Sequence, residues 1–354
     1  MLTRLLLRDF RCFEAVALEP GTGANFLVGA NAQGKTSVLE AVCVLLRLQS
    51  PRARTMGELT RHGANGWQVR GTLLECELQC AVQSRRRRLE INGGEPESTA
   101  EYLANGRVVW FGNRDLELIS GRGEGRRRYL DFLGQQLDPE YRKAWRQYKQ
   151  AMSSRNALLK ENNTHAREQN AVYESILTRH GAYLRQVRIA MVERLIPAID
   201  AAHKAIGQGR EKLQLHYAAP GDEAALAEAL AAARERDFRM GQTSAGPHRD
   251  DLDLLVDERP AARYASEGQQ RTIALALKCG QERLLSQLPG APPLLLIDDI
   301  FGELDLDRRR ALLRFLPDDL QMWITATHLD WAEGFPDGSR HWEVSGHQVT
   351  PIAS

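Results

Sequence analysis

Gly29-Ala30-Asn31-Ala32-Gln33-Gly34-Lys35-Thr36 is the stretch that decides the fold of this chain. It matches the pattern G-x-x-x-x-G-K-[ST] at every fixed position. The apolar residues Phe26–Val28 before it predict a strand, and Thr36–Leu48 after it predicts a helix. Glycines allow the loop to turn its N–H groups toward phosphate oxygens. The dipole of the helix also favours a negative charge at its N-terminus. The sequence therefore predicts a phosphate-binding loop in an α/β fold.

The predicted ligand of this loop is ATP with Mg²⁺. Lys35 is expected to neutralise charge on the β- and γ-phosphates, and Thr36 to ligate Mg²⁺ through its hydroxyl. Leu294–Asp299 supplies the second half of the site, with four apolar residues followed by two carboxylates. Such a run is typical of a buried central strand whose tip lies beside the phosphate loop. Asp298 is expected to hold the metal and Asp299 to orient the attacking water.

Two further motifs distinguish the classes of P-loop protein. Ser266-Glu267-Gly268-Gln269 is expected to begin a helix, with Ser266 at the N-cap and Gly268 allowing close backbone approach. The backbone amides at the N-terminus of this helix would form a second phosphate-binding site. His328 follows the predicted strand Trp323–Thr325, from which it could reach a γ-phosphate. Taken alone, the Ser266 segment is also compatible with an ordinary helix cap, and His328 with an ordinary loop histidine. Their order after a phosphate loop is what makes them specific.

Composition places the chain among soluble globular proteins. At roughly 100–200 residues per domain, 354 residues predict two or three domains, and 43% of residues are hydrophobic. The longest apolar runs are far shorter than the ~20 residues of a membrane span. The first residues lack the apolar core of a signal peptide. A cytoplasmic protein with no membrane partner is expected, and its five scattered cysteines are interpreted as reduced thiols.

Charge is distributed unevenly along the chain. The net charge is +1, but residues 107–210 contain 19 Lys and Arg against 11 Asp and Glu. This excess is compatible with a phosphate-rich partner, and equally with solvated helix faces. The candidate DNA contacts are two arginine runs: Arg85, Arg86, Arg87 and Arg88, and Arg126, Arg127 and Arg128. The first run could instead protect an edge strand by charge, and the second could pair with Asp131 or with the interface between lobes.

The pattern of elements predicts an α/β protein with a helical insertion. The first hundred residues alternate like strands, and Asn92-Gly93 predicts a hairpin. Residues 125–206 show helical spacing, which predicts two long antiparallel helices that turn near residues 161–168. Sheet and helix alternate again afterwards. The predicted organisation is an N-terminal ATPase part at 1–120, a helical insertion or lid at 121–208, and a C-terminal ATPase part at 209–354.

These motifs, together with Gly302-Glu303-Leu304-Asp305, resemble an ATP-binding-cassette ATPase. More closely, essentially the whole chain resembles the RecF family of bacterial recombination mediators. Seven blocks of sequence carry this resemblance: Leu7–Arg11, Asn25–Asn31, Asp115–Gly121, Arg126–Asp131, Arg155–Leu159, Gly246–Asp251 and Asp298–Phe301. The implied fold is an ABC-type P-loop ATPase head, a mixed β-sheet with helices, that has an inserted helical lid.

The resemblance also implies a site shared by two copies of the chain. The phosphate loop, Ser37 and Arg11 of one protomer would bind ATP, and the signature residues Ser266, Gly268 and Gln269 of the other would cap its γ-phosphate. ATP would then drive homodimerisation, with Thr36 and Asp298 on the metal.

Asp299 and His328 are the implied catalytic residues. Many cassette ATPases carry glutamate at the position of Asp299. Because a carboxylate misplaced by about 1 Å can cost on the order of 100-fold in rate, weak hydrolysis is expected.

The implied function is DNA repair. RecF-like proteins bind junctions between single- and double-stranded DNA and work with RecO and RecR to load RecA at single-strand gaps and stalled replication forks. This sequence departs from the family pattern at Asn113-Arg114, where Pro-Glu is usual, at Glu267, where glutamine is commoner, and at Gly302, where serine is commoner. The first departure lies in the predicted Mg²⁺-sensing loop, and the other two face the predicted dimer interface.

Three other P-loop classes fit the sequence less well. The ATPase subunit of a membrane transporter normally has the signature Leu-Ser-Gly-Gly-Gln close after its helical subdomain. A small-molecule kinase would have no use for Ser266 and its helix. A chromosome-organising protein of the structural-maintenance type would need a much longer coiled coil than residues 125–206 provide.

Overall fold

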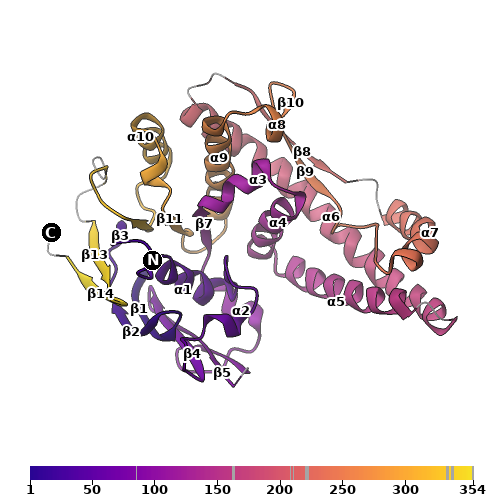
Figure 1. Cartoon of the computed structure of the whole chain (residues 1–354), viewed down its shortest axis with the longest axis horizontal. Coiled ribbons are helices and arrows are strands. Elements are labelled where there is room, and N and C mark those ends of the chain that lie inside the picture. The colour runs from indigo at the N-terminus through magenta and orange to yellow at the C-terminus, as the bar shows by residue number, and fades with distance from the viewer. Residues whose placement is uncertain are drawn as a thin grey trace. The chain divides into compact units, whose positions relative to one another are not determined.

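The computed structural model describes residues 1–84, 86–161, 164–207, 209, 211–219, 223–331, 335 and 339–352 (Figure 1). The chain forms two compact units. The first contains Met1–Asp115, Lys204–Gln208 and Leu275–Ser354, and the second contains Leu116–His203 and Gly209–Ala274. The second unit therefore extends beyond the expected lid and includes the signature segment. The three-part division at residues 120 and 208 stays a prediction.

A six-stranded sheet forms the centre of the first unit, in the order β14-β13-β3-β12-β11-β7. Strands β13 to β7 run parallel, and β14 pairs antiparallel with β13. Strands β11 and β12 are almost entirely buried, as expected for parallel strands covered on both faces. The bounds are β3 Ala24–Val28, β7 Val108–Gly112, β11 Leu294–Asp298, β12 Met322–Ala326, β13 Arg340–Ser345 and β14 Gln348–Pro351.

Helix α1, Lys35–Arg47, lies between this sheet and a second, antiparallel one. The second sheet has the order β2-β1-β4-β5-β6. Because α1 contacts both sheets, its residues from Ser37 to Arg47 are buried. The strands are β1 Leu2–Phe10, β2 Phe13–Leu18, β4 Gly66–Leu73, β5 Cys76–Gln83 and β6 Arg86–Ile91. The remaining short elements are η1 Met56–Leu59, α2 Thr99–Ala104, η2 Asn113–Leu116, η3 Phe301–Glu303 and α10 Leu306–Phe315.

The hairpin predicted at Asn92-Gly93 forms only its turn. Both residues have positive φ, at 50° and 79°, and Ile91 bridges to Gly94. No strand follows, because the chain enters α2, where Ser98 Oγ accepts a hydrogen bond from the Glu101 amide. The prediction of a second strand was therefore wrong.

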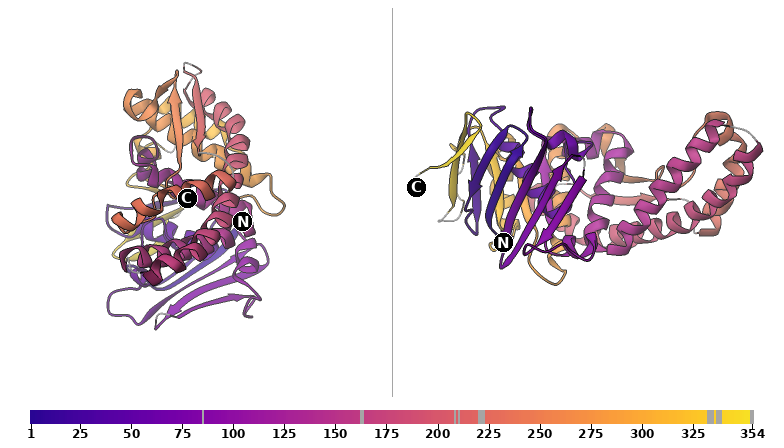
Figure 2. Two further views of the ribbon diagram at one scale, coloured as in Figure 1. Left: turned by 90° about the vertical axis from the view of Figure 1, so that its right-hand side faces the viewer. Right: turned by 90° about the horizontal axis from the view of Figure 1, so that it is seen from below.

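The second unit is mainly helical, with a small sheet in the order β10-β9-β8. Figure 2 shows α5 and α6 running side by side, and buried residues of α5, α6 and α7 share one apolar core. Its helices are α3 Glu117–Ser120, α4 Gly123–Leu137, α5 Pro139–Glu161, α7 Glu223–Met240 and α8 Ala261–Tyr264. Two further helices begin in this unit and end in the first: α6 Thr164–Gly207, from Lys204 on, and α9 Glu267–Ser286, from Leu275 on. The strands are β8 Leu213–Ala218, β9 Asp251–Val256 and β10 Arg259–Pro260. None of the described helices is long and apolar enough to cross a membrane.

Three helices, rather than the two that were predicted, fill the region of the expected insertion. The break between α4 and α5 falls at Asp138-Pro139, where the Glu140 amide donates to Asp138 Oδ1 at 2.9 Å. Proline suits the first turn of a helix, since its missing N–H has no intrahelical partner there. Helix α5 ends at Glu161 and α6 begins at Thr164, and residues 162–163, on which the predicted turn partly falls, lie outside the described residues.

Candidate nucleotide-binding site

The candidate site lies at the carboxyl edge of the six-stranded sheet. Parallel strands end at the same edge, and in the register Asp298 lies beside Gly112 on one side and Thr325 on the other. The phosphate loop follows the neighbouring strand β3. Segments from four distant parts of the first unit therefore meet at this edge, as open α/β sheets require for a ligand site.

The phosphate loop is held tightly against its surroundings. The Gly29 amide donates to Ala326 O at 3.2 Å. A Cβ on Gly29 would lie 2.2 Å from Val344 O, and one on Gly34 would lie 2.6 Å from Cys12 Sγ. Gly34 also has φ 108°, a value that favours glycine. Both fixed glycines of the motif are thus required by space, and at Gly34 also by backbone conformation.

Lys35 is directed into the phosphate loop. Its Nζ donates to Gly29 O at 2.5 Å and to Ala30 O at 2.9 Å, and the residue is buried. Burial lowers the pKa of Lys35, while the charges of Asp299 and Asp298 raise it. A cation held among backbone groups in this loop is suited to binding phosphate oxygens.

Thr36 and Asp298 meet as the sequence predicted. Thr36 Oγ1 donates to Asp298 Oδ1 at 2.7 Å, and Thr325 Oγ1 donates to the same oxygen at 2.9 Å. Burial raises the pKa of Asp298, and the hydrogen bonds from both threonines oppose that shift. Thr325 also accepts a hydrogen bond from the Asp299 amide at 2.9 Å. Thr325 had no role in the sequence-based site, although it ends a predicted strand.

The donor set at this position suits Mg²⁺. A hydroxyl and a carboxylate are hard oxygen ligands, and Mg²⁺ in phosphate sites takes one or two carboxylates together with phosphate and water. Among the described residues, no cluster of three or more His, Cys, Asp or Glu side chains forms another metal site. Thr36 and Asp298 therefore fit a metal ion that also contacts a nucleotide.

The segment after β7 is held by structural contacts. The Asp115 side chain is 15% exposed, with Oδ1 at 2.7 Å from Lys278 Nζ and Oδ2 accepting from the Gly112 amide at 2.7 Å. Burial raises the pKa of Asp115, and Lys278 opposes the shift. Asn113 Nδ2 donates to Glu303 Oε1 at 3.0 Å. Sequence reasoning did not predict the Lys278–Asp115 ion pair.

His328 and Arg11, two other predicted site residues, each contact an acidic residue. The His328 side chain is 60% exposed, and its Nδ1 lies 3.4 Å from Asp330 Oδ2. Arg11 binds both carboxylate oxygens of the buried Glu40 on α1, at 2.7 and 2.8 Å, and donates to Glu58 O at 3.0 Å. Arg11 therefore forms an ion pair with the helix that follows the phosphate loop. Its contact with nucleotide stays a prediction.

The signature segment forms an exposed, capped helix start. The Gln269 amide donates to Ser266 Oγ at 3.3 Å, and the Ser266 amide donates to Gln269 Oε1 at 2.5 Å. This reciprocal pair is a capping box, which satisfies two backbone donors. Gln269 Nε2 also donates to Glu211 Oε1 at 2.8 Å. Ser266 and Glu267 face solvent, so the terminus that begins α9 is accessible.

The two arginine runs differ in their surroundings. Arg86, Arg87 and Arg88 are exposed on the edge strand β6, and Arg88 Nε lies 2.7 Å from Glu90 Oε1. Arg85 lies outside the described residues.

Arg126 makes several contacts within the second unit. It binds both oxygens of Asp251 at 2.8 Å and donates to Leu118 O and Gly121 O at 3.0 Å. The alternative partner considered for this run, Asp131, instead lies 2.6 Å from Arg188 Nη2. Four of the five donors of Arg126 are therefore occupied within the second unit.

Comparison with known proteins identifies the family. A model described as an AAA domain matches residues 4–94. The DNA replication and repair protein RecF of a Synechococcus strain is 37% identical, over 98% of this chain and 97% of the relative. RecF of Gloeobacter violaceus is also 37% identical, over 91% of each chain. This chain belongs to the RecF family. The resemblance stated from sequence is thereby confirmed.

Solved structures confirm the predicted fold class. A structure of the recombination mediator RecF with ATP, from the RecFOR pathway, aligns with a TM-score of 0.89 at 28% identity, over 99% of this chain and 97% of that one. The Smc head domain from Pyrococcus furiosus aligns over 99% of this chain and 96% of that one, with a TM-score of 0.57 at 16% identity, which shows a shared fold alone. The chain is thus a RecF-family protein with an ABC-type ATPase head.

Proposed function

We propose that this protein is an ATP-dependent DNA-binding protein in the recombinational repair of single-strand gaps and stalled replication forks. The observation that carries the proposal is the meeting of Lys35, Thr36 and Asp298 at one sheet edge, in a chain of the RecF family. The relatives are named for DNA replication and repair, and a RecF structure contains ATP. Junctions of single- and double-stranded DNA are the proposed substrate, and RecO, RecR and, through them, RecA are the proposed partners.

Hydrolysis is proposed to proceed by attack of water on the γ-phosphate. Loop amides and Lys35 bind the phosphates, and Thr36 and Asp298 hold the metal. Bound there, Mg²⁺ would neutralise charge on the β- and γ-phosphate oxygens. Asp299 accepts a hydrogen bond from the attacking water. The water oxygen bonds to the γ-phosphorus while the bond to the β,γ-bridging oxygen breaks, so ADP leaves and the water proton goes to the phosphate product. His328, on an exposed loop after β12, donates to the γ-phosphate.

ATP is proposed to join two copies of the chain. The exposed Ser266 terminus of one protomer donates to the γ-phosphate held by the other, with charge-assisted hydrogen bonds. Each ATP hydrolysed removes these bonds from the interface, so the dimer dissociates. Turnover of this kind would time the release of DNA.

Ser266→Arg should abolish ATP-dependent dimerisation while leaving ATP binding intact. The bulky cation would fill the space of the γ-phosphate contact without altering the protomer's own phosphate loop. Sedimentation velocity with and without ATP measures the dimer, and a fluorescent ATP analogue measures binding. Ser98→Arg is the matched control, because Ser98 also caps a helix but lies outside the proposed interface. Dimers of normal stability in the Ser266 variant would exclude the shared site.

Asp299→Asn should keep ATP binding and dimerisation but lower hydrolysis further, by about 100-fold. The amide occupies the same volume as the carboxylate, yet it orients the attacking water poorly. Phosphate release under single-turnover conditions measures the chemical step, and sedimentation shows whether the dimer persists. Hydrolysis at the unmodified rate would remove Asp299 from the reaction.

The DNA part of the proposal is tested by sedimentation with gapped DNA. When gapped DNA and ATP are added together, we expect a complex that contains two protomers. When only gapped DNA or only ATP is added, we expect the complex of the protein to be weaker. A complex that forms equally well without ATP would separate DNA binding from the nucleotide switch and contradict the proposal.

A further inference from the structure

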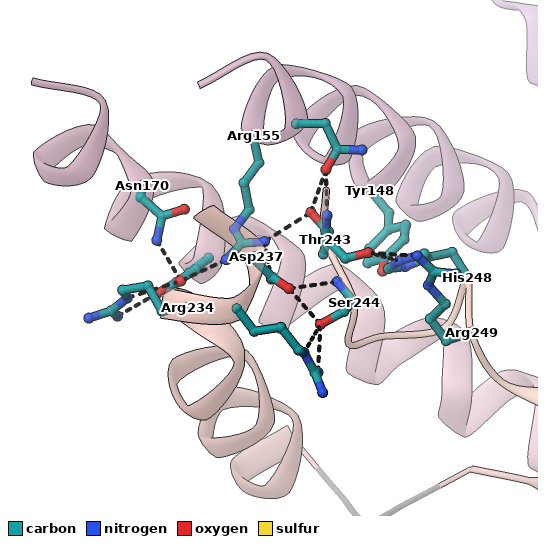
Figure 3. Close-up of polar contacts among 12 residues, drawn as sticks. Tyr148, Arg155, Asn170, Arg234, Asp237, Thr243, Ser244, His248 and Arg249 are labelled. Atoms are coloured by element: carbon teal, nitrogen blue, oxygen red, sulfur yellow. Dashed lines mark hydrogen bonds and ion pairs between the residues drawn. The ribbon is translucent and has the colours of Figure 1, made fainter. Parts of the chain in front are cut away.

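A loop in the second unit, residues 241–250, connects α7 to β9 and contains much of the family block Gly246–Asp251. His248 lies in the second half of this loop (Figure 3). His248 Nδ1 lies 2.6 Å from Tyr148 Oη, and Nε2 lies 3.0 Å from Thr243 O. Burial lowers the pKa of His248 to about 4, so the ring is neutral at pH 7 and bonded at both nitrogens. The histidine is thus part of the framework of the loop.

The same loop is anchored to the helices by a buried polar network (Figure 3). Arg155 on α5 is fully buried, and its Nη1 donates to Asp237 Oδ2 at 2.8 Å and to Thr243 Oγ1 at 2.9 Å. Asn156 Oδ1 accepts from both the amide and the hydroxyl of Thr243, at 2.8 and 2.7 Å. The family block Arg155–Leu159 therefore fixes the loop that leads to the second block.

Backbone geometry makes the loop rigid at Gly246. Its φ is 128°, and a Cβ there would lie 2.3 Å from Tyr148 Oη. The neighbouring Asp250 is also fixed, because it binds Arg185 through both carboxylate oxygens at 2.8 Å. A loop held at each of these points presents its exposed side chains in one geometry.

Arg249, like Gln242, is an exposed residue of this loop. Figure 3 shows Arg249 next to His248. Its single hydrogen bond is a long one, from Nη2 to Thr243 O at 3.3 Å. Arg127, at the start of α4, donates to Asp250 O at 2.9 Å and is partly exposed. Within the described part of the chain, neither arginine has a carboxylate within ion-pair distance, whereas the adjacent Arg126 and Arg128 each have one.

Arg127 and Arg249 both donate to backbone carbonyls of this loop, Arg127 to Asp250 O and Arg249 to Thr243 O. Both positive charges act on the His248 ring and help to lower its pKa, whereas Asp250 acts in the opposite direction. Asp250 is already neutralised by Arg185. The surface around His248 therefore carries two guanidinium groups that form no ion pair within the described residues, and Arg127 also interacts electrostatically with Asp251.

We propose that Arg127 and Arg249, held by the buried network beneath them, form a binding site for backbone phosphates of DNA. The inference rests on the proposed DNA-binding function and assigns a contact surface to it. Guanidinium groups bind phosphate through paired N–H donors, and a fixed geometry reduces the entropy lost on binding. Phosphate contacts carry no sequence information, which suits a protein that acts at gaps wherever they occur.

Arg127→Gln and Arg249→Gln should each weaken binding of gapped DNA about tenfold, because each removes a charge-assisted contact. The slope of log affinity against log salt should also become shallower by about one unit for each variant. The matched control is Arg239→Gln, at an exposed arginine on α7 that belongs to neither arginine run. Fluorescence anisotropy over a salt series measures both quantities. Sedimentation with ATP should show unchanged dimers.

The outcomes separate this inference from the function on which it rests. If the unmodified protein fails to bind gapped DNA, the proposed function fails. If it binds but Arg127→Gln and Arg249→Gln behave like Arg239→Gln, the function stands and this site is excluded. If Arg127→Gln and Arg249→Gln keep the full salt slope but lose capture of an acidic protein partner, the surface recognises protein and the proposal is overturned. Thermal unfolding of each variant verifies that the loop remains folded.

Discussion

Replacing Lys35 with methionine should abolish ATP binding. The lysine ammonium is the only charged side chain that donates directly to the carbonyls of the phosphate loop in the described structure, at Gly29 and Ala30. Charge-assisted hydrogen bonds are worth about 1.5–3 kcal/mol each, so loss of two bonds to phosphate weakens affinity by about 100-fold or more. Methionine has nearly the same length, so the change removes the charge with little loss of packing.

Isothermal titration with ATP measures this effect directly. The control is Lys149→Met, at an exposed lysine on α5 in the other unit, which should bind ATP normally. Circular dichroism verifies that both variants are folded. Normal ATP affinity in the Lys35 variant would mean that the nucleotide is held elsewhere, and the whole assignment of the site would have to be abandoned.

Replacing Arg155 with methionine should destabilise the protein by about 3–5 kcal/mol, because removal of one partner leaves a buried charge without compensation. Asp237 is fully buried and accepts from Arg155 Nη1, and Glu174 accepts from Nη2 at 3.1 Å. The site described above would lose its anchor at the same time. The urea dependence of circular dichroism measures the free energy of unfolding.

Arg167→Met is the matched control for this variant. Arg167 forms an ion pair with Glu235 across α6 and α7, but its side chain is 45% exposed, so its loss should cost less than about 1 kcal/mol. Combining Arg155→Met with Asp237→Leu should recover part of the stability, because the unpaired carboxylate is also removed. Equal losses for Arg155→Met and Arg167→Met would show that the buried network is not what stabilises this region.

Much of the first unit could be predicted because its signals are local. The phosphate loop fixes a strand before it and a helix after it, and the observed α1 differs from the predicted helix by one residue at each end. Strand β7 was missed, because a short buried run such as Val108–Gly112 has no periodicity that separates it from a helix. The break at Asp138-Pro139 was also missed, although proline after an aspartate is a recognisable helix start.

The residues of the candidate site also fall into those that could be predicted from the sequence and those that could not. Thr36 and Asp298 were predicted to meet because parallel strands end at the same edge of a sheet. In the structure Thr36 Oγ1 lies 2.7 Å from Asp298 Oδ1. The Lys278–Asp115 pair and the network around Arg155 were not predicted, since their members come from distant helices and loops. Arginines on a helical segment give no sequence signal of whether they are buried or exposed, because only packing decides it.

Strand β3, which precedes the phosphate loop, has β12 and β13 as its sheet neighbours, and both are made roughly 300 residues later. Translation at roughly 5–20 residues per second therefore leaves this apolar strand without a neighbour for about 15–60 s. We expect the exposed apolar strand to favour aggregation during that time. Premature termination before residue 322 would yield a polypeptide whose ATP-binding segment can never be completed.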